Sequence, residues 1–122
     1  MPSSLEKVLE KLRAAKLVTF NDVSIDGPNT KGNTWGDTPL HIVAIWGDTE
    51  SARILIEAGA EIDACGEDDY TPLHNAIEQG NADMVALLLK AGANPFRTSR
   101  NGDAFVLAQL SEDPEILGRL RH

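Results

Sequence analysis

The chain has 122 residues and a formal net charge of −8, the size of one domain with an acidic balance. That charge argues against binding to the phosphates of nucleic acids and favours a basic partner, although acidity also keeps a protein soluble. The first ten residues are polar, and nowhere do 18 apolar residues follow one another, so we expect neither a signal peptide nor a membrane span.

The first predicted element is an amphipathic helix that begins at Leu5, with Ser3 or Ser4 as its N-cap. Leu5, Val8 and Leu9 fall on one face together with Leu12, and charged residues occupy the other face. We interpret this helix as an N-terminal cap, within a cap-and-arm segment that covers residues 1–32.

Residues 17–33 lose the helical period. Apolar and polar residues roughly alternate there, and turn residues follow at 26–29 and 31–33. The pattern predicts an extended arm or a long hairpin. Such a long loop is a secondary candidate for partner binding, but it could equally cover the exposed edge of the first repeat.

An internal repeat follows the arm. The tetrapeptide Thr38-Pro39-Leu40-His41 returns as Thr71-Pro72-Leu73-His74, and residues 33–65 can be laid over 66–98 without a gap. A period of this length predicts a stacked solenoid, in which each unit buries its apolar face against the next.

Each tetrapeptide predicts the start of a helix, because Thr is a good N-cap and Pro suits the first helical position. In the first repeat we expect helices at 39–46 and about 50–58, the second of them capped by Thr49. In the second repeat we expect helices at 72–79 and after Asn81, which acts as the cap. Residues 99–122 form a degenerate last repeat without the tetrapeptide, as a terminal unit requires.

At these residues the chain resembles the ankyrin repeat family. Residues 33–98 follow that family's order of a turn, Gly-x-Thr-Pro-Leu-His, a short helix, Gly, a longer helix and Gly-Ala, with a departure at Asp69, where a turn glycine is usual. The resemblance implies a single all-α solenoid with β-turn fingers over residues 1–122. It also implies a fold that binds other macromolecules and does not catalyse reactions.

Catalytic and metal chemistry are not expected. His41 and His74 lie in the tetrapeptides, where the resemblance implies hydrogen bonds to backbone and to the capping Thr. No second His or Cys lies at ligand spacing, so we expect no metal, and no cofactor-binding motif is present. Cys65 has no partner for an internal disulfide, which suits a cytoplasmic protein.

The resemblance also implies which residues are free to bind a partner. They lie at the finger tip, just before the Thr and at the end of the first helix of each repeat, on one concave face. These partner-binding candidates are Thr34, Trp35, Asp37, Ile45, Trp46, Glu67, Asp68, Tyr70, Glu78, Gln79, Arg100, Asn101 and Asp103, with Ser111 and Glu112 less securely aligned.

Both tryptophans and the one tyrosine of the chain fall in this set, and large aromatic rings dominate binding hot spots. The alternative is that Trp35 and Trp46 pack against the arm. We therefore expect a monomeric, non-catalytic module that binds a basic protein, as an inhibitor or immunity protein of a toxin or nuclease. A scaffold that joins two partners is the alternative; we favour the inhibitor because the sequence contains no second domain or linker.

Overall fold

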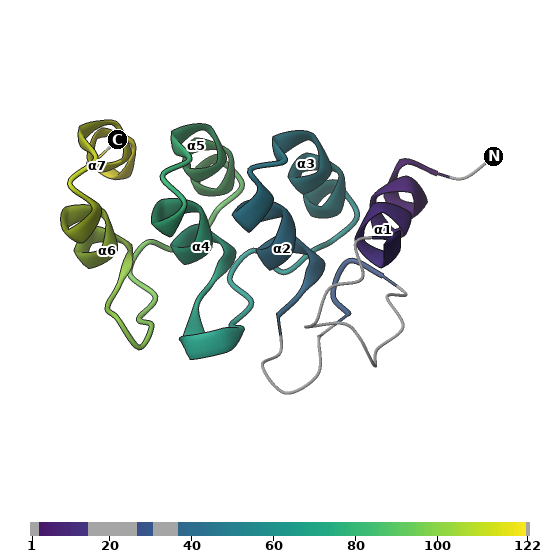
Figure 1. Ribbon diagram of the computed structural model, residues 1–122, viewed down its shortest axis with the longest axis horizontal. Helices are drawn as coiled ribbons and strands as arrows, with labels where there is room; N and C mark the ends of the chain where they lie inside the picture. Colours follow the sequence, from purple (N-terminus) through teal and green to yellow (C-terminus); the bar gives the residue numbers. More distant parts are fainter. Residues whose placement is uncertain (1–2, 15–26, 31–36, 122) are drawn as a thin grey trace.

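The computed structural model describes residues 3–14, 27–30 and 37–121, in which seven α-helices form two layers (Figure 1). The inner layer consists of α2 (Pro39–Trp46), α4 (Pro72–Glu78) and α6 (Ala104–Ser111). The outer layer consists of α3 (Thr49–Glu57), α5 (Ala82–Lys90) and α7 (Pro114–Arg121), and α1 (Ser4–Ala14) continues it by packing on α3. The predicted all-α solenoid is confirmed.

The core lies between the layers and between successive units. Leu40 and Leu73 from the inner layer are buried together with Leu55, Leu88 and Ile116 from the outer layer. Each such side chain stabilises the fold by about 1.5–3 kcal/mol through loss of apolar surface. None of the helices in the described ranges is both long and apolar enough to cross a membrane.

The apolar face predicted for the first helix is confirmed. Val8, Leu9 and Leu12 are buried, and the Ser3 hydroxyl accepts the Glu6 amide at 3.1 Å, which makes Ser3 the cap. In the described residues α1 packs against α3, so its apolar face joins the core of the first repeat.

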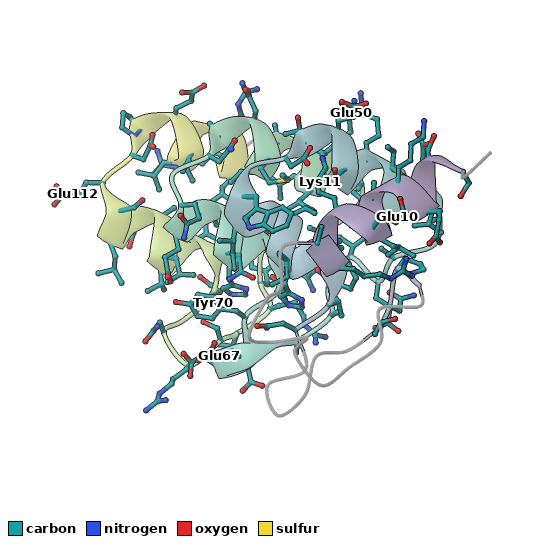
Figure 2. All side chains as sticks on the ribbon, turned by 45° about the vertical axis from the view of Figure 1, so that its right-hand side comes forward. Glu10, Lys11, Glu50, Glu67, Tyr70 and Glu112 are labelled. Carbon is teal, nitrogen blue, oxygen red and sulfur yellow. The ribbon has the colours of Figure 1, made fainter. Side chains whose placement is uncertain are left out.

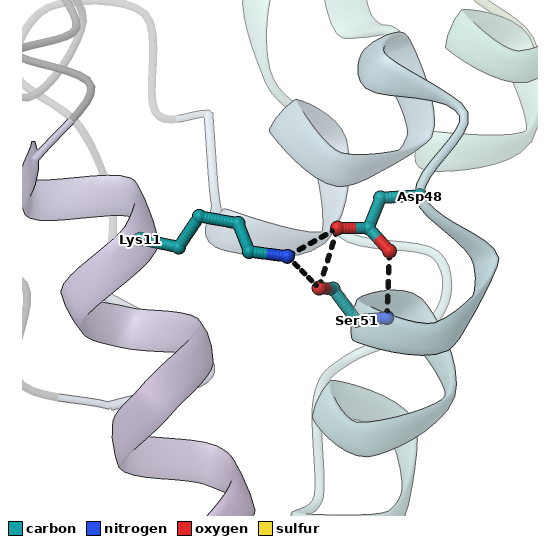
Figure 3. Close-up of polar contacts among 3 residues, drawn as sticks. All are labelled: Lys11, Asp48 and Ser51. Carbon is teal, nitrogen blue, oxygen red and sulfur yellow. Dashed lines mark hydrogen bonds and ion pairs between the residues drawn. The ribbon is translucent and has the colours of Figure 1, made fainter.

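Lys11 fastens α1 to the start of α3 (Figure 3). Its ammonium donates to Asp48 Oδ2 at 2.8 Å and to Ser51 Oγ at 3.3 Å, and Asp48 Oδ1 accepts the Ser51 amide at 3.1 Å. Partial burial opposes ionisation of Asp48, but the hydrogen bonds from Lys11 and Ser51 outweigh it and lower the pKa of this carboxyl. The prediction that Thr49 caps this helix is therefore wrong, because Asp48 supplies the acceptor and Thr49 is the first helical residue.

Each tetrapeptide histidine joins its own helix to the next unit. The Thr71 amide donates to His74 Nδ1 at 3.0 Å, so the proton of the neutral ring lies on Nε2, which is 3.2 Å from the Gly102 carbonyl oxygen. His41 repeats the arrangement, with the Thr38 amide at 3.0 Å and the Tyr70 carbonyl oxygen at 2.8 Å. The predicted structural role of both histidines is confirmed.

The turn before α4 forms despite its missing glycine. Glu67–Asp69 is a short 3-10 helix, η2, in which Asp68 and Asp69 take positive φ angles of 58° and 60°. Asp tolerates this left-handed region better than most residues do. Gly66 is required for another reason, because a Cβ there would collide with the Asp37 carboxylate.

The last unit is one residue shorter than the others in the turn before its first helix. Thr71 follows Thr38 by 33 residues, whereas Asp103, the N-cap of α6, follows Thr71 by 32. Thr38 and Thr71 precede the left-handed residues Gly47 and Gly80 by nine positions, and Asp103, the N-cap of α6, precedes the left-handed Glu112 by the same interval. The ends of α2 and α4 therefore correspond to Leu110 and Ser111. The predicted alignment with Ser111 and Glu112 is wrong by one residue.

Most of the predicted arm lies outside the described residues. Its residues 27–30 form a turn in which the Thr30 amide donates to the Gly27 carbonyl at 3.3 Å. The Asn29 side chain contacts the loop after α3, donating to the Gly59 carbonyl at 3.0 Å and accepting the Glu61 amide at 2.7 Å. This contact ties the turn to the first repeat.

We expect Thr71→Ala to lower the free energy of unfolding by about 1 kcal/mol or more. The hydroxyl is buried, lies 2.7 Å from His74 Nδ1 and accepts the His74 amide at 3.4 Å, so its loss weakens both the cap and the histidine's position. Urea unfolding at constant m-value measures the change. Thr98→Ala, at an exposed site, is the control, and equal midpoints for the two variants would contradict the prediction.

Stability should fall as the pH drops below about 6.5. Desolvation by burial lowers the pKa of both His41 and His74 from 6.5, so the unfolded chain binds protons that the folded chain resists. The stabilisation is complete above the pKa that the two histidines have in the unfolded chain. It is lost as the pH falls from that value toward their lower pKa values in the folded chain. Urea midpoints between about pH 7.5 and 5.5 measure the slope, which should be smaller in His41→Gln. A flat wild-type profile would exclude this linkage.

Candidate functional site

The exposed ends of the three inner helices form one aligned surface, which we name the inner-helix row. Equivalent positions on packed helices lie side by side, because each helix is followed by a left-handed residue at the same interval. The row consists of Ile45 and Trp46 on α2, Glu78 on α4 with Gln79 at its C-cap, and Leu110 and Ser111 on α6.

Three large apolar side chains of the row are in contact with solvent. Ile45 is 38% exposed, Trp46 40% and Leu110 71%. They sit on the two flanking helices, whereas the middle helix presents Glu78 and Gln79. Because these exposed apolar side chains are aligned on one surface, the row is suited to be covered by another molecule.

Charge is divided unevenly between the two layers. The inner helices and the turns before them, residues 37–46, 66–79 and 99–112, contain seven carboxyl side chains and one cationic side chain, Arg100. The four outer helices contain six carboxyl and seven cationic side chains. The excess negative charge of these segments therefore belongs to the inner layer and its turns.

The single cation of this layer is already paired. Arg100 lies 3.2 Å from Asp68 Oδ1, and its amide donates to the Asp68 carbonyl at 2.9 Å. Such an exposed pair contributes little to stability, but it offsets one positive charge locally. Glu67 and Asp69 remain exposed at the tip of the turn, and Figure 2 shows Glu67 below Tyr70 there.

Tyr70 does not match the expectation of an exposed anchor. It is 7% exposed, its hydroxyl donates to Glu78 Oε2 at 2.6 Å, and the same oxygen accepts from the Asn101 amide group at 2.9 Å. Desolvation and the hydrogen bond with the carboxylate raise the pKa of Tyr70. The ring therefore links α4 to the next turn and holds Glu78 in place.

Asp37 and Asp103 also serve the scaffold. Asp37 is buried and accepts the Glu67 amide at 2.9 Å, which joins two successive turns. Asp103 caps α6 by accepting the Val106 amide at 3.1 Å. Both were expected to be free for a partner, but their carboxylates already have backbone partners. Thr34 and Trp35 lie outside the described residues.

Within the described residues, metal-ligating side chains do not form a cluster. No group of three His, Cys, Asp or Glu side chains gathers within these ranges as a metal site. Both ring nitrogens of His41 and of His74 have hydrogen-bond partners, so neither ring is available as a base.

Leu110 is the site residue that the sequence analysis missed. The signal was Asp103, a residue type favoured at helix N-caps, which places α6 one residue earlier than the ungapped alignment does. With that shift, Leu110 aligns with Ile45 and Glu78. The row then has an apolar side chain at both ends.

Comparison with known proteins identifies the repeated units. The family described as "Ankyrin repeats (3 copies)" matches residues 8–99. The 2-5A-dependent ribonuclease of Mus musculus is 42% identical over 66 residues, which are 52% of this chain and 9% of that protein. The B-cell lymphoma 3 protein of Homo sapiens is 35% identical over 77 residues, which are 60% of this chain and 17% of that protein.

A third relative is palmitoyltransferase ZDHHC13 of Mus musculus, which is 46% identical over 67 residues, covering 54% of this chain and 10% of that protein. The matches thus span at most 17% of the length of these three relatives. The similarity concerns the repeats, and it does not extend to the remainder of those proteins.

Tyr70→Phe should lower the free energy of unfolding by about 1 kcal/mol, because it removes a hydroxyl that bridges Glu78 and Asn101. Chemical unfolding measures the change. The matched test is the same substitution in a Glu78→Gln background, where the loss should be smaller because the charged acceptor is already absent. Equal losses in the two backgrounds would mean that the two side chains are not coupled.

Proposed function

Because the chain belongs to the ankyrin repeat family, whose repeats are protein-interaction modules, we propose that it binds a protein with a basic surface. The binding surface is the inner-helix row together with the acidic turn at Glu67 and Asp69. The observation that carries the proposal is the concentration of carboxylates in the inner layer beside three exposed apolar side chains.

The carboxylates and the apolar side chains of this surface contribute differently to binding. Carboxylates on one face attract a basic partner over a distance and orient it, which raises the association rate. Apolar anchors such as Trp46 then supply affinity once water is excluded, since large aromatic rings are enriched at binding hot spots. An interface of this composition has an apolar centre and a charged rim.

We further propose that the chain acts as an inhibitor, in the manner of an immunity protein of a toxin or nuclease. A basic surface is the electrostatic footprint of a nucleic-acid-binding site, so a protein that covers it competes with the nucleic acid. The carboxylates of the inner layer and its turns support this role, because they would take the place of the nucleic acid's phosphates on the basic surface. We propose that the free chain is a monomer.

An adaptor role is the second candidate, and it requires a second binding surface. The outer layer offers a shallow hollow between α3 and α5, with both apolar and charged walls. Its lining residues include Arg53, Ile56, Glu57, Asp83, Leu87 and Lys90. A chain that holds two different proteins, one on each layer, would favour the adaptor over the inhibitor.

Capture from a native lysate should yield a basic protein that is lost when Glu67 and Glu78 are both changed to Gln. The matched control is the double change of Glu50 and Glu57 to Gln, which removes the same charge from α3 on the outer layer. Mass spectrometry identifies the partner. If both double variants retain the protein equally, the inner-helix row and the acidic turn are excluded as its binding surface.

With the purified partner, the association rate should fall as salt rises, because exposed charges are screened beyond about 10 Å at 0.1 M ionic strength. Stopped-flow kinetics measures this rate. An equimolar amount of this protein should also reduce the partner's binding to nucleic acid. An association rate independent of salt contradicts electrostatic attraction, and undiminished nucleic-acid binding contradicts inhibition.

A further inference from the structure

We propose that the inner-helix row recognises one arginine of the partner that is flanked on both sides by apolar side chains. Glu78 binds the guanidinium, while Trp46 with Ile45 and Leu110 contact the apolar neighbours. The inference rests on the proposed function, because it specifies which part of a basic protein meets this surface.

Glu78 is positioned before any partner arrives. The Tyr70 hydroxyl donates to Glu78 Oε2 at 2.6 Å, and Asn101 fixes that hydroxyl from the next turn at 2.9 Å. The hydrogen bond occupies Oε2 and not Oε1, and Glu78 is exposed at the end of α4. A carboxylate whose orientation is already set loses less conformational entropy when it binds a cation.

The neighbours of Glu78 favour arginine over lysine. A guanidinium is planar, is less strongly hydrated than an ammonium and stacks on aromatic faces while it pairs with a carboxylate. Trp46 lies at the end of the adjacent helix α2, 40% exposed, and no cation of the described chain pairs with Glu78. An ammonium would have to shed more water between apolar side chains.

The spacing of the row specifies the partner's sequence. Packed helices lie about 8–10 Å apart, so the two apolar anchors lie about that distance on either side of Glu78. Three residues of a polyproline II helix span about 9.3 Å and make one turn, and seven residues of an α-helix span about 10.5 Å and make about two turns. Either interval keeps the three side chains on one face. The matching segment therefore has an apolar residue, an arginine and an apolar residue at one of these two intervals.

The surrounding charge supports the same orientation. Glu67 and Asp69 lie exposed on the turn that precedes α4, and the nearby cation Arg100 is held by Asp68. No unpaired positive charge of the inner layer therefore opposes an arginine at Glu78 in the described residues. The acidic turn attracts basic residues beside the central one.

Nuclear magnetic resonance titration of the whole chain with synthetic peptides tests the proposal. One peptide of about 15 residues is helical, with Leu, Arg and Leu about seven positions apart, and a shorter proline-rich peptide in the polyproline II conformation has them about three apart. Matched peptides carry glutamine in place of arginine. We expect one arginine peptide to shift the Trp46 indole and the amides of Glu78 and Leu110 together, and its glutamine version to bind about tenfold more weakly.

Variants of the chain provide matched controls. Glu78→Gln and Leu110→Ala should each weaken binding of the arginine peptide several-fold. The amide spectrum of each variant is the check that it remains folded. Glu50→Gln removes a charge from the outer layer, where Figure 2 shows Glu50 far from Tyr70, and Phe96→Ala removes an apolar ring that is 69% exposed outside the row. Neither control should change the affinity.

Equal binding of the arginine and glutamine peptides would overturn the arginine site, and so would unchanged affinity in Glu78→Gln. Shifts confined to Glu67 and Asp69 would overturn the row but leave a basic partner for the acidic turn, so the proposed function would stand. Absence of binding by every peptide also overturns the row as a recognition element. The capture and salt experiments judge the proposed function independently of these results.

Discussion

The buried imidazoles of His41 and His74 each bridge two successive units, and the alignment of the inner helices depends on these bridges. Each ring accepts an amide from its own N-cap residue and donates to a carbonyl of the next turn. A stacked unit cannot bury its apolar face alone, so a directional bond between units fixes how far one helix slides along its neighbour. Val106 takes the equivalent place in the last unit, where the described chain has no further turn to bind.

The polar residues of the inner layer form two groups: those that hold the stack together and those that are open to solvent for a partner. Asp37 and Asp103 accept backbone amides, and the Tyr70 hydroxyl connects α4 to the following turn, so these groups maintain the stack. Glu78 belongs to both groups, because one of its oxygens holds Tyr70 while its position at the end of α4 leaves it open to solvent. A scaffold bond thereby orients a carboxylate on the surface that we propose for binding.

Much of the fold could be predicted from the sequence because its signals are local. Thr71 and Pro72 specify a helix start through their own backbone chemistry, and the repeat period specifies the stacking. The burial of Tyr70 could not be predicted in this way, since it depends on Glu78 and on Asn101 from the next unit. The capping bond of Asp48 to the Ser51 amide is local, so this cap was open to prediction, and only the Lys11 contact with its carboxylate comes from far along the chain.

The row extends to α6, although the sequence motif is lost there, because Glu112 adopts the left-handed conformation that Gly47 and Gly80 have in the earlier units. Gly47 has a φ of 74° and faces the Asn81 side chain, which a Cβ would strike, whereas Gly80 has open space around it. A side chain at an unhindered position such as that of Gly80 meets only the conformational cost of the left-handed region, about 1–2 kcal/mol. Glu112 adopts that conformation with a φ of 56°, so α6 ends as α2 and α4 do. Because the backbone turns at the same interval, Leu110 stays aligned with Ile45 and Glu78 without a glycine.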